Sequence, residues 1–128
     1  MARETNKKSE ATVLKEILLA APKYGVTLFR NNVAQAWVGE SRTLKNGDVL
    51  IKNPRRLHAG LCVGSSDLIG WRSSPQMGDT FAIFVAIEVK GPRGRSSQWQ
   101  EHFIDRVNKS GGIAGVCRSV EDFIKLVS

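Results

Sequence analysis

Cysteine and aromatic residues are scarce in this sequence. Its 128 residues include two cysteines, Cys62 and Cys117, and both lie in apolar runs. Two cysteines cannot supply the dense disulfides of small secreted domains, so we expect two buried thiols in a reducing compartment. Aromatic residues make up 7%, and we expect three of them, Trp37, Trp71 and Trp99, to anchor the core or an interface.

Long apolar runs are also missing. No run approaches the roughly 20 residues of a membrane span, and the polar residues 1–8 are not followed by a secretory apolar stretch. The sequence also has no internal repeats, linkers or low-complexity segments. We therefore expect a cytoplasmic protein, or one in the host cytoplasm if it is encoded by a phage, with no membrane partner. Its length fits a basic arm over residues 1–8 and a single domain over residues 9–128.

Acidic residues are outnumbered by basic ones. Twelve Asp and Glu stand against 19 Lys and Arg, which gives a formal net charge of +7 at pH 7. This balance favours a polyanionic partner, nucleic acid first, although a basic solvated surface explains the charge equally well. With 41% apolar and 24% charged residues, the chain has the composition of a folded domain rather than of a disordered tail.

The hydrophobic periodicity predicts an α/β fold in which helices flank a mixed central β-sheet. Ser9 and Ser97 are expected helix N-caps, and Ser97 with Gln100 makes a capping-box pattern. Helices are expected over residues 9–21, 98–109 and from 119, strands over 26–30, 67–71, 81–90 and 113–117, and loops over 53–66 and 72–80. A hairpin with arms near residues 36–38 and 49–52 is expected around the turn Asn46-Gly47.

The strand predicted over residues 81–90 ends in a carboxylate and an ammonium group. Glu88 and Lys90 are two residues apart and therefore share one face of the strand. Both faces are otherwise apolar, which predicts an interior strand, and a buried Glu is costly unless something pairs with it. The partner is Lys90 or a metal ion; the simpler alternative is an ion pair at a frayed strand end.

Asp67 adds a second carboxylate at the start of the preceding strand. If the two strands are antiparallel and fold about Met77-Gly78, Asp67 lies opposite Glu88. Two carboxylates so close repel each other and raise one pKa, and a divalent cation relieves that repulsion. Carboxylate oxygens are ligands that suit Mg²⁺ or Mn²⁺.

Glu10 is a candidate third carboxylate, from the first helix. At 100° per residue it falls in the middle of the apolar stripe formed by Val13, Leu14, Ile17 and Leu18, whereas Glu16 falls off that stripe. A charge that favours the positive end of the helix dipole would explain an acid at this position, but not why it faces the core.

Together these residues resemble the Asp and Glu-x-Lys signature of the PD-(D/E)XK nucleases, and more narrowly a stand-alone VRR-NUC domain of the phage type. The resemblance spans Glu10 to Phe123. It rests on ordered motifs that include Arg30-Asn31-Asn32, Gly64 to Gly70, Ile87 to Lys90, and Ser97 with Gln100. The family usually has Pro before the Asp, where this chain has Ser66.

The resemblance implies a restriction-endonuclease-like core and metal-dependent hydrolysis of DNA phosphodiesters, on branched DNA such as four-way junctions, by a homodimer. It implies Mg²⁺ or Mn²⁺ held by Glu10, Asp67 and Glu88 with the Val89 carbonyl. Lys90 would orient the nucleophile or stabilise developing charge, and Gln100 would help to position both.

DNA contacts are expected from basic and amide side chains after the strand over residues 81–90, beside the hairpin and at the end of the strand over residues 26–30. The candidates are Arg30, Asn31, Asn32, Arg55, Arg56, Arg93 and Arg95. Two alternatives stay open: a DNA-binding module without catalysis, in which the carboxylates are structural, and a zinc site. The zinc site would use His58, Cys62, His102 and Cys117, although their spacing matches no zinc finger.

Overall fold

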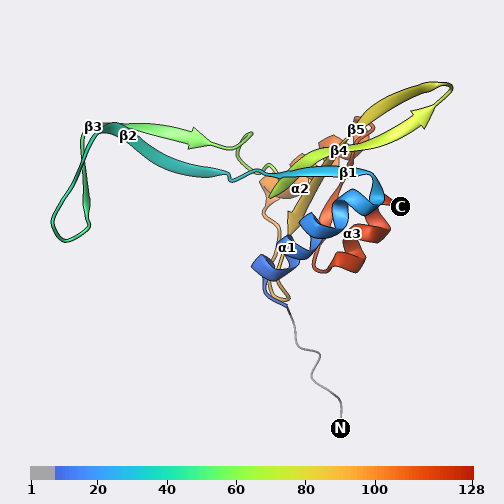
Figure 1. Cartoon of the computed structure of the whole chain (residues 1–128), viewed down its shortest axis with the longest axis horizontal. Helices are drawn as coiled ribbons and strands as arrows, with labels where there is room; N and C mark the ends of the chain where they lie inside the picture. The colour runs from blue at the N-terminus through green and yellow to red at the C-terminus, as the bar shows by residue number, and fades with distance from the viewer. Residues whose placement is uncertain (1–7) are drawn as a thin grey trace, which may run out of the picture.

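The computed structural model describes residues 8–128 (Figure 1). The elements are α1 (Glu10–Ala20), η1 (Ala21–Tyr24), β1 (Val26–Arg30), β2 (Ala34–Thr43), β3 (Val49–Ala59), β4 (Leu68–Gln76), β5 (Asp79–Val89), α2 (Gln98–Lys109), β6 (Ile113–Cys117) and α3 (Val120–Val127). Apart from Lys8, the basic arm expected at the N-terminus lies outside the described residues.

A four-stranded mixed sheet forms the centre of the body, in the order β1-β4-β5-β6. The pairs β1–β4 and β4–β5 are antiparallel, and β5–β6 is parallel. β5 is therefore an interior strand, as its two apolar faces predicted. This architecture confirms the expected α/β class with a mixed sheet flanked by helices.

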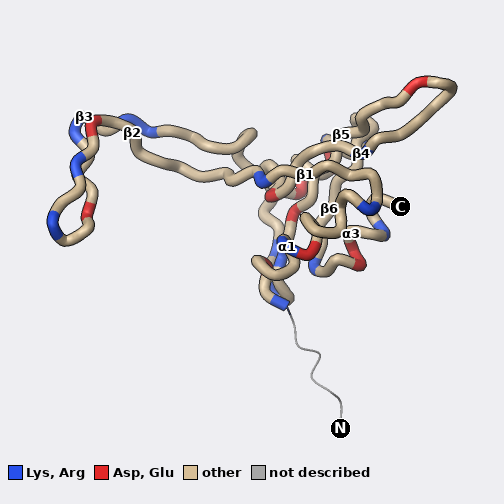
Figure 2. The backbone as a smooth tube through the Cα atoms, in the orientation of Figure 1, with Lys and Arg blue, Asp and Glu red and all other residues tan. Residues whose placement is uncertain are grey.

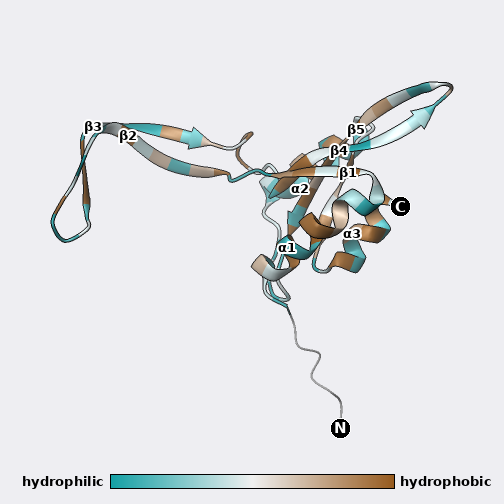
Figure 3. Cartoon of the chain, viewed as in Figure 1, coloured by the Kyte–Doolittle hydropathy of each residue, from teal (hydrophilic) through white to brown (hydrophobic). Residues whose placement is uncertain are grey.

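The hydrophobic core lies between the sheet and α1 with α3. Val13 and Ile17 of α1, Val85 and Ile87 of β5, and Phe123 of α3 are all fully buried in it. Figure 3 shows apolar residues gathered where these helices meet the sheet. Because residues alternate along a strand, Glu88 lies on the opposite face from Ile87. α2 covers that opposite face, so the two sides of the sheet have different helices over them.

Local capping determines where the helices begin. The Ser9 hydroxyl accepts from Thr12 N, and the Ser119 hydroxyl accepts from Asp122 N. At α2, Ser97 and Gln100 form the complete capping box that the sequence predicts. These caps satisfy backbone donors that have no partner inside the helix.

The prediction of a loop over residues 72–80 is wrong. β4 continues to Gln76 and β5 starts at Asp79, so a two-residue turn joins them. Its residues, Met77 and Gly78, have φ of 50° and 87°, which suits the tight turn of a twisted hairpin. Pro75 is tolerated because β1 pairs with β4 only as far as Arg72, which leaves the outer part of β4 at a sheet edge.

The loop expected over residues 53–66 is also partly wrong, because β3 continues to Ala59. β2 and β3 form a separate two-stranded sheet that joins no strand of the central sheet. A register shift between Val38 and Glu40, with φ of 51° at Asn53, marks a bulge that accommodates Pro54. The hairpin projects from the body as a long arm with a bend near its middle (Figure 1).

The expectation that both thiols are buried is wrong for one of them, and for the tryptophans the core is excluded while an interface stays a prediction. Cys62 is exposed, because Leu61–Val63 is a surface segment rather than a core strand, whereas Cys117 is buried as expected. None of the three tryptophans lies in the core: Trp37, Trp71 and Trp99 are 54%, 40% and 67% exposed. Within residues 8–128, no helix has the length and apolar character needed to cross a membrane.

Candidate functional site

The antiparallel pairing of β4 and β5 brings two carboxylates together. Leu68 pairs with Ile87, so the same register sets Asp67 opposite Glu88. The Asp67 Oδ2 atom accepts a hydrogen bond of 2.8 Å from Val89 N, which fixes this carboxylate against β5. Strand register thus creates the acid pair that the sequence predicted.

Glu88 is almost completely buried, at 2% exposure. Its Oε1 atom lies 3.2 Å from Lys90 Nζ and accepts a hydrogen bond of 3.0 Å from Gln100 Nε2. Its Oε2 atom is buried and has no hydrogen-bond partner among the described residues. Burial, and after it the nearby charge of Asp67, raises the pKa of Glu88 to about 7, although Lys90 opposes that rise.

Gln100 links this carboxylate to the start of α2. Its Oε1 atom accepts from Ser97 N over 2.9 Å, while its Nε2 atom donates to Glu88. One amide therefore closes the capping box through its oxygen and binds the acid through its nitrogen. Gln100 thus lies beside the acid pair, and its role in positioning the nucleophile and Lys90 stays a prediction.

Gly64 allows the loop before Asp67 to approach α2 closely. A Cβ atom at this position would lie 2.7 Å from backbone atoms of Trp99, and the φ of Gly64 is +81°. Both conditions require glycine. A glycine three residues before Asp67 is the signal in the sequence for this close approach.

Asn31 is buried, at 7% exposure, and its side chain is bound within the protein, so its contact with DNA stays a prediction. Its Nδ2 atom donates to the hydroxyl of Ser65 and the carbonyl of Ser66, each over 2.8 Å, and its Oδ1 atom accepts from Leu61 N over 2.8 Å. Its backbone N–H donates to the Asp67 carbonyl over 2.7 Å. Asn31 therefore holds the hairpin root and the loop before Asp67 in place.

Glu10 does not join the acid pair. Its side chain is exposed, and its backbone lies beside Gly91, two residues after the end of β5, where an added Cβ would lie 3.8 Å from Glu10 N. The cause is the layering: α1 packs on the sheet face opposite the one that bears Glu88.

No metal-binding group of three or more His, Cys, Asp or Glu residues occurs within residues 8–128. The structure thus brings together two of the three expected acids. The four His and Cys residues weighed for zinc do not gather either.

The donor set of the pair nevertheless suits a divalent cation. A buried carboxylate oxygen without a partner, close to a second carboxylate, is a costly arrangement that positive charge would relieve. Oxygen ligands of this kind suit hard cations. Asp67 and Glu88 therefore fit such an ion, while the Val89 carbonyl remains a predicted ligand.

A polar pocket of about 330 Å³ opens beside the pair, with Asp67, Gln100, Asn32 and Ser65 in its lining. A larger hollow of about 640 Å³ lies elsewhere, between the outer part of β5 and the end of α2, and is lined by residues such as Phe84 and Phe103. The pocket next to the acids is thus the smaller of the two.

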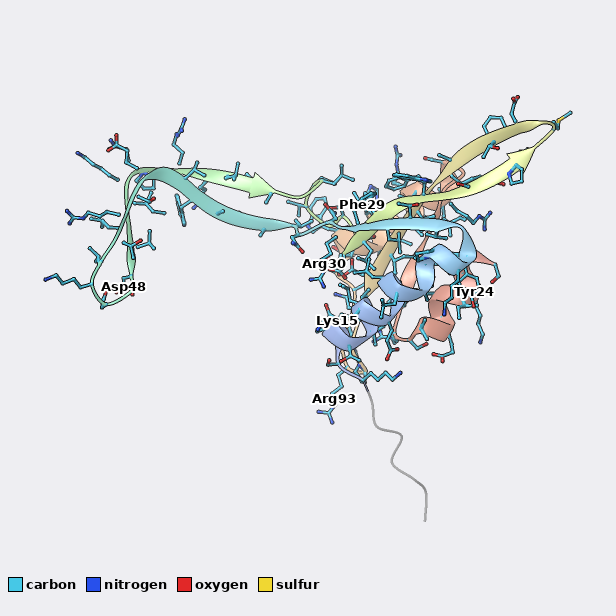
Figure 4. The ribbon with its side chains drawn as sticks, viewed as in Figure 1. Lys15, Tyr24, Phe29, Arg30, Asp48 and Arg93 are labelled. Carbon is cyan, nitrogen blue, oxygen red and sulfur yellow. The ribbon has the colours of Figure 1, made fainter. Side chains whose placement is uncertain are left out.

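The other expected DNA contacts are exposed. They are Arg30, Asn32, Arg55, Arg56, Arg93 and Arg95. Arg30 lies near the hairpin root and Arg93 extends from the opposite end of the body (Figure 4). Arg55 and Arg56 belong to β3, where the Arg56 guanidinium lies 5.5 Å from the centroid of the Trp37 ring. These cations are therefore distributed over the body and the arm.

The mixed sheet, with Asp67 at the start of one strand and Glu88-x-Lys90 at the end of its neighbour, defines a restriction-endonuclease-like nuclease fold. The sequence model of one such family, described as VRR-NUC domain, matches residues 9–121. The chain therefore belongs to the VRR-NUC domain family. Membership indicates a nuclease-type function in DNA processing, in a family that usually depends on divalent metal. No curated protein matches the chain.

Proposed function

We propose that this protein is an endonuclease that uses Mg²⁺ or Mn²⁺ to hydrolyse phosphodiester bonds in branched DNA, such as four-way junctions, as a homodimer. The observation that carries the proposal is the environment of Glu88. This carboxylate is buried opposite Asp67 and receives Lys90 and Gln100 on one oxygen, while its other oxygen has no partner within the described chain.

Asp67 and Glu88 would hold the ion, with the Val89 carbonyl as a further ligand. When bound, a divalent cation lowers the pKa of a coordinated water and neutralises charge on the phosphate. Val89 N keeps the Asp67 carboxylate directed at the site, which removes the entropy of orienting it. Gln100 does the same for Glu88 from the first turn of α2.

Lys90 supplies a positive charge that the reaction can use. Its side chain is 14% exposed, and a Cβ at Gly94 would lie 3.1 Å from its Cδ atom, so the loop after β5 packs closely on its stem. A cation held in this way stabilises negative charge that develops on phosphate oxygens, because it needs little reorganisation. Lys90 would therefore stabilise charge or orient the attacking water.

The test is cleavage of supercoiled and four-way-junction DNA with Mg²⁺, Mn²⁺ or EDTA. Asp67→Asn, Glu88→Gln and Lys90→Met should each lower the rate at least about 100-fold, because each removes charge at the reacting centre. Glu101→Gln, an exposed acid in the first turn of α2, is the matched control. Metal-independent cleavage, or full activity in Glu88→Gln, would contradict the proposal.

Two further measurements test the homodimer and the preference for branched DNA. A homodimer predicts twice the chain mass in sedimentation and paired incisions across a junction, since a two-fold axis supplies two sites. A preference for linear duplex over junctions would contradict the branched substrate while leaving the endonuclease intact.

A DNA-binding module without hydrolysis is the second candidate. The exposed side chain of Glu10 favours it, because only two acids meet at the site. This candidate predicts DNA binding without incision under every metal condition. If the protein does cut, Glu10→Gln measures whether the third acid contributes, and an unchanged rate assigns the metal to Asp67 and Glu88 alone.

A further inference from the structure

Within residues 8–128, the β2–β3 hairpin pairs with no strand of the central sheet. It forms its own two-stranded sheet, and isolated hairpins of this kind are at best marginally stable in water. Large apolar side chains along it are exposed, including Trp37, Leu50 and Leu57 at 54%, 54% and 46%. We expect a two-stranded arm with so many exposed apolar side chains to bind a partner.

The charge of the arm indicates the class of partner that it binds. Residues 34–59 carry the cations Arg42, Lys45, Lys52, Arg55 and Arg56 against two carboxylates, Glu40 and Asp48. None of these cations forms an ion pair with an acid in residues 8–128. Figure 2 shows basic residues near the bend of the arm and on the part beyond it.

One of the two carboxylates is already engaged. Asp48 Oδ2 accepts from Asn46 Nδ2 over 2.8 Å, and Asp48 N donates to Asn46 Oδ1 over 3.0 Å, so this acid helps to close the turn. If a second copy of the chain packed arm against arm, it would set one positive surface against another. A polyanion has the complementary charge, and DNA is the polyanion of the proposed function.

The shape of the arm fits a duplex. β3 has 11 residues, so at roughly 3.3 Å per residue its length measured along the bent strand is about 35 Å, close to the rise of one turn of B-DNA. The bulge bends it, and Gly39 makes the bend possible, because a Cβ there would lie 2.7 Å from the Lys52 carbonyl oxygen. A two-stranded ribbon is narrow enough to enter the major groove.

The arm also starts at the acid site. Its two ends are joined through Asn31, whose side chain accepts from Leu61 N and whose backbone bonds to Asp67. DNA that lies along the arm is therefore held in a defined position relative to Asp67 and Glu88.

We propose that the β2–β3 hairpin is a duplex-binding arm that lies in the major groove beside the scissile position, with Arg42, Lys45, Lys52, Arg55 and Arg56 on phosphates. The choice of DNA rests on the proposed function. The test is made in EDTA, where binding is measured without cleavage, so the two proposals can fail separately.

The experiment measures affinity for a 30-base-pair duplex at a series of salt concentrations. The variant Arg42→Gln/Lys45→Gln/Lys52→Gln removes charge from the outer arm. The matched control, Lys15→Gln/Lys23→Gln/Lys125→Gln, removes the same charge from exposed positions on α1, η1 and α3. Thermal unfolding checks that both variants fold.

Each lost phosphate contact lowers the slope of log affinity against log salt by about 0.9, so the arm variant should lose up to about 2.7 while the control keeps the wild-type slope. Between 50 and 200 mM salt, wild-type affinity should then fall about 40-fold more than that of the variant. Equal slopes in variant and control would overturn the proposal. Loss of a dimer in sedimentation, with an unchanged slope, would overturn it in favour of an interface between copies.

The cleavage assay separates this result from the proposed function. A reduced slope in the arm variant, together with no cleavage by the wild type in any metal, supports the arm and rejects the endonuclease. Cleavage by the wild type with equal slopes supports the endonuclease and rejects the arm.

Discussion

The side-chain amide of Gln100 donates to Glu88 Oε1 over 3.0 Å, while the other end of the same amide accepts from Ser97 N. Gln100→Ala should therefore lower both the stability of the protein and its cleavage rate. We expect about 1 kcal/mol less stability from the damaged cap, and a fall of about 10-fold or more in cleavage rate because Glu88 loses a partner.

Ser97→Ala is the control for this prediction. It removes the other half of the capping box but leaves the amide of Gln100 free to bind Glu88, so it should cost similar stability and much less rate. Equal loss of rate in the two variants, measured against thermal unfolding, would show that Gln100 acts only through the helix.

The raised pKa of Glu88 makes the stability of the metal-free protein depend on pH. Glu88 has a pKa of about 7 in the folded protein and a reference value of 4.5. The folded state is therefore more stable relative to the unfolded state when Glu88 is protonated. Its contribution is fully present below pH 4.5 and is lost as the pH rises through 7. Glu88→Gln should thus be more stable than wild type at pH 8, by on the order of 2 kcal/mol, and equal to it near pH 4.

Urea unfolding in EDTA at both pH values measures this difference. A constant gap between Glu88→Gln and wild type at every pH would mean that Glu88 does not titrate differently on folding.

Gly64→Ala should disrupt the approach of the Asp67 loop to α2. The substitution adds backbone strain at a φ of +81° to a contact of 2.7 Å with Trp99. We expect a loss of about 3 kcal/mol or more, with loss of cleavage. Gly47→Ala is the control, because its φ is +90° but nothing lies within 4 Å of the added atom. It should cost only about 1–2 kcal/mol and should leave the acid site intact.

Asn31→Ala should destabilise the protein rather than simply weaken DNA binding. It would leave Leu61 N and the Ser66 carbonyl without their side-chain partner, at a cost of about 2–4 kcal/mol. Asn32→Ala, at the exposed neighbouring position, should change stability by no more than about 0.5 kcal/mol. Urea unfolding compares the stability of the two variants. Unchanged stability in Asn31→Ala together with weaker DNA binding would instead indicate that Asn31 contacts DNA directly.

Local patterns made much of this fold predictable from sequence. The apolar residues on both faces of β5 indicated an interior strand, and the Ser97 and Gln100 spacing indicated the start of α2. The pairing of Asp67 with Glu88 followed because a single turn, Met77-Gly78, determines the register between two adjacent strands. In each case the deciding interactions lie within a short segment or one hairpin.

The remaining features depend on distant contacts. A helical wheel placed Glu10 on the buried stripe of α1, but it cannot say which face of the sheet that stripe covers, and the acids lie on the other face. Asn31 is buried by residues about 30 positions further along the chain. The long arm was underestimated because a ribbon exposed on both sides needs no alternation of apolar and polar residues.

Because only one of the two thiols is exposed, a thiol-reactive dye can be used to detect binding of nucleic acid to this protein. Burial raises the pKa of Cys117 to about 12, which leaves it inert toward alkylating reagents, whereas Cys62 is exposed. Its backbone N–H donates to the same Ser65 hydroxyl that Asn31 binds, at the junction of arm and acid site. A maleimide dye would therefore label the native chain at a single position, where its fluorescence reports the arrival of a nucleic acid without any substitution.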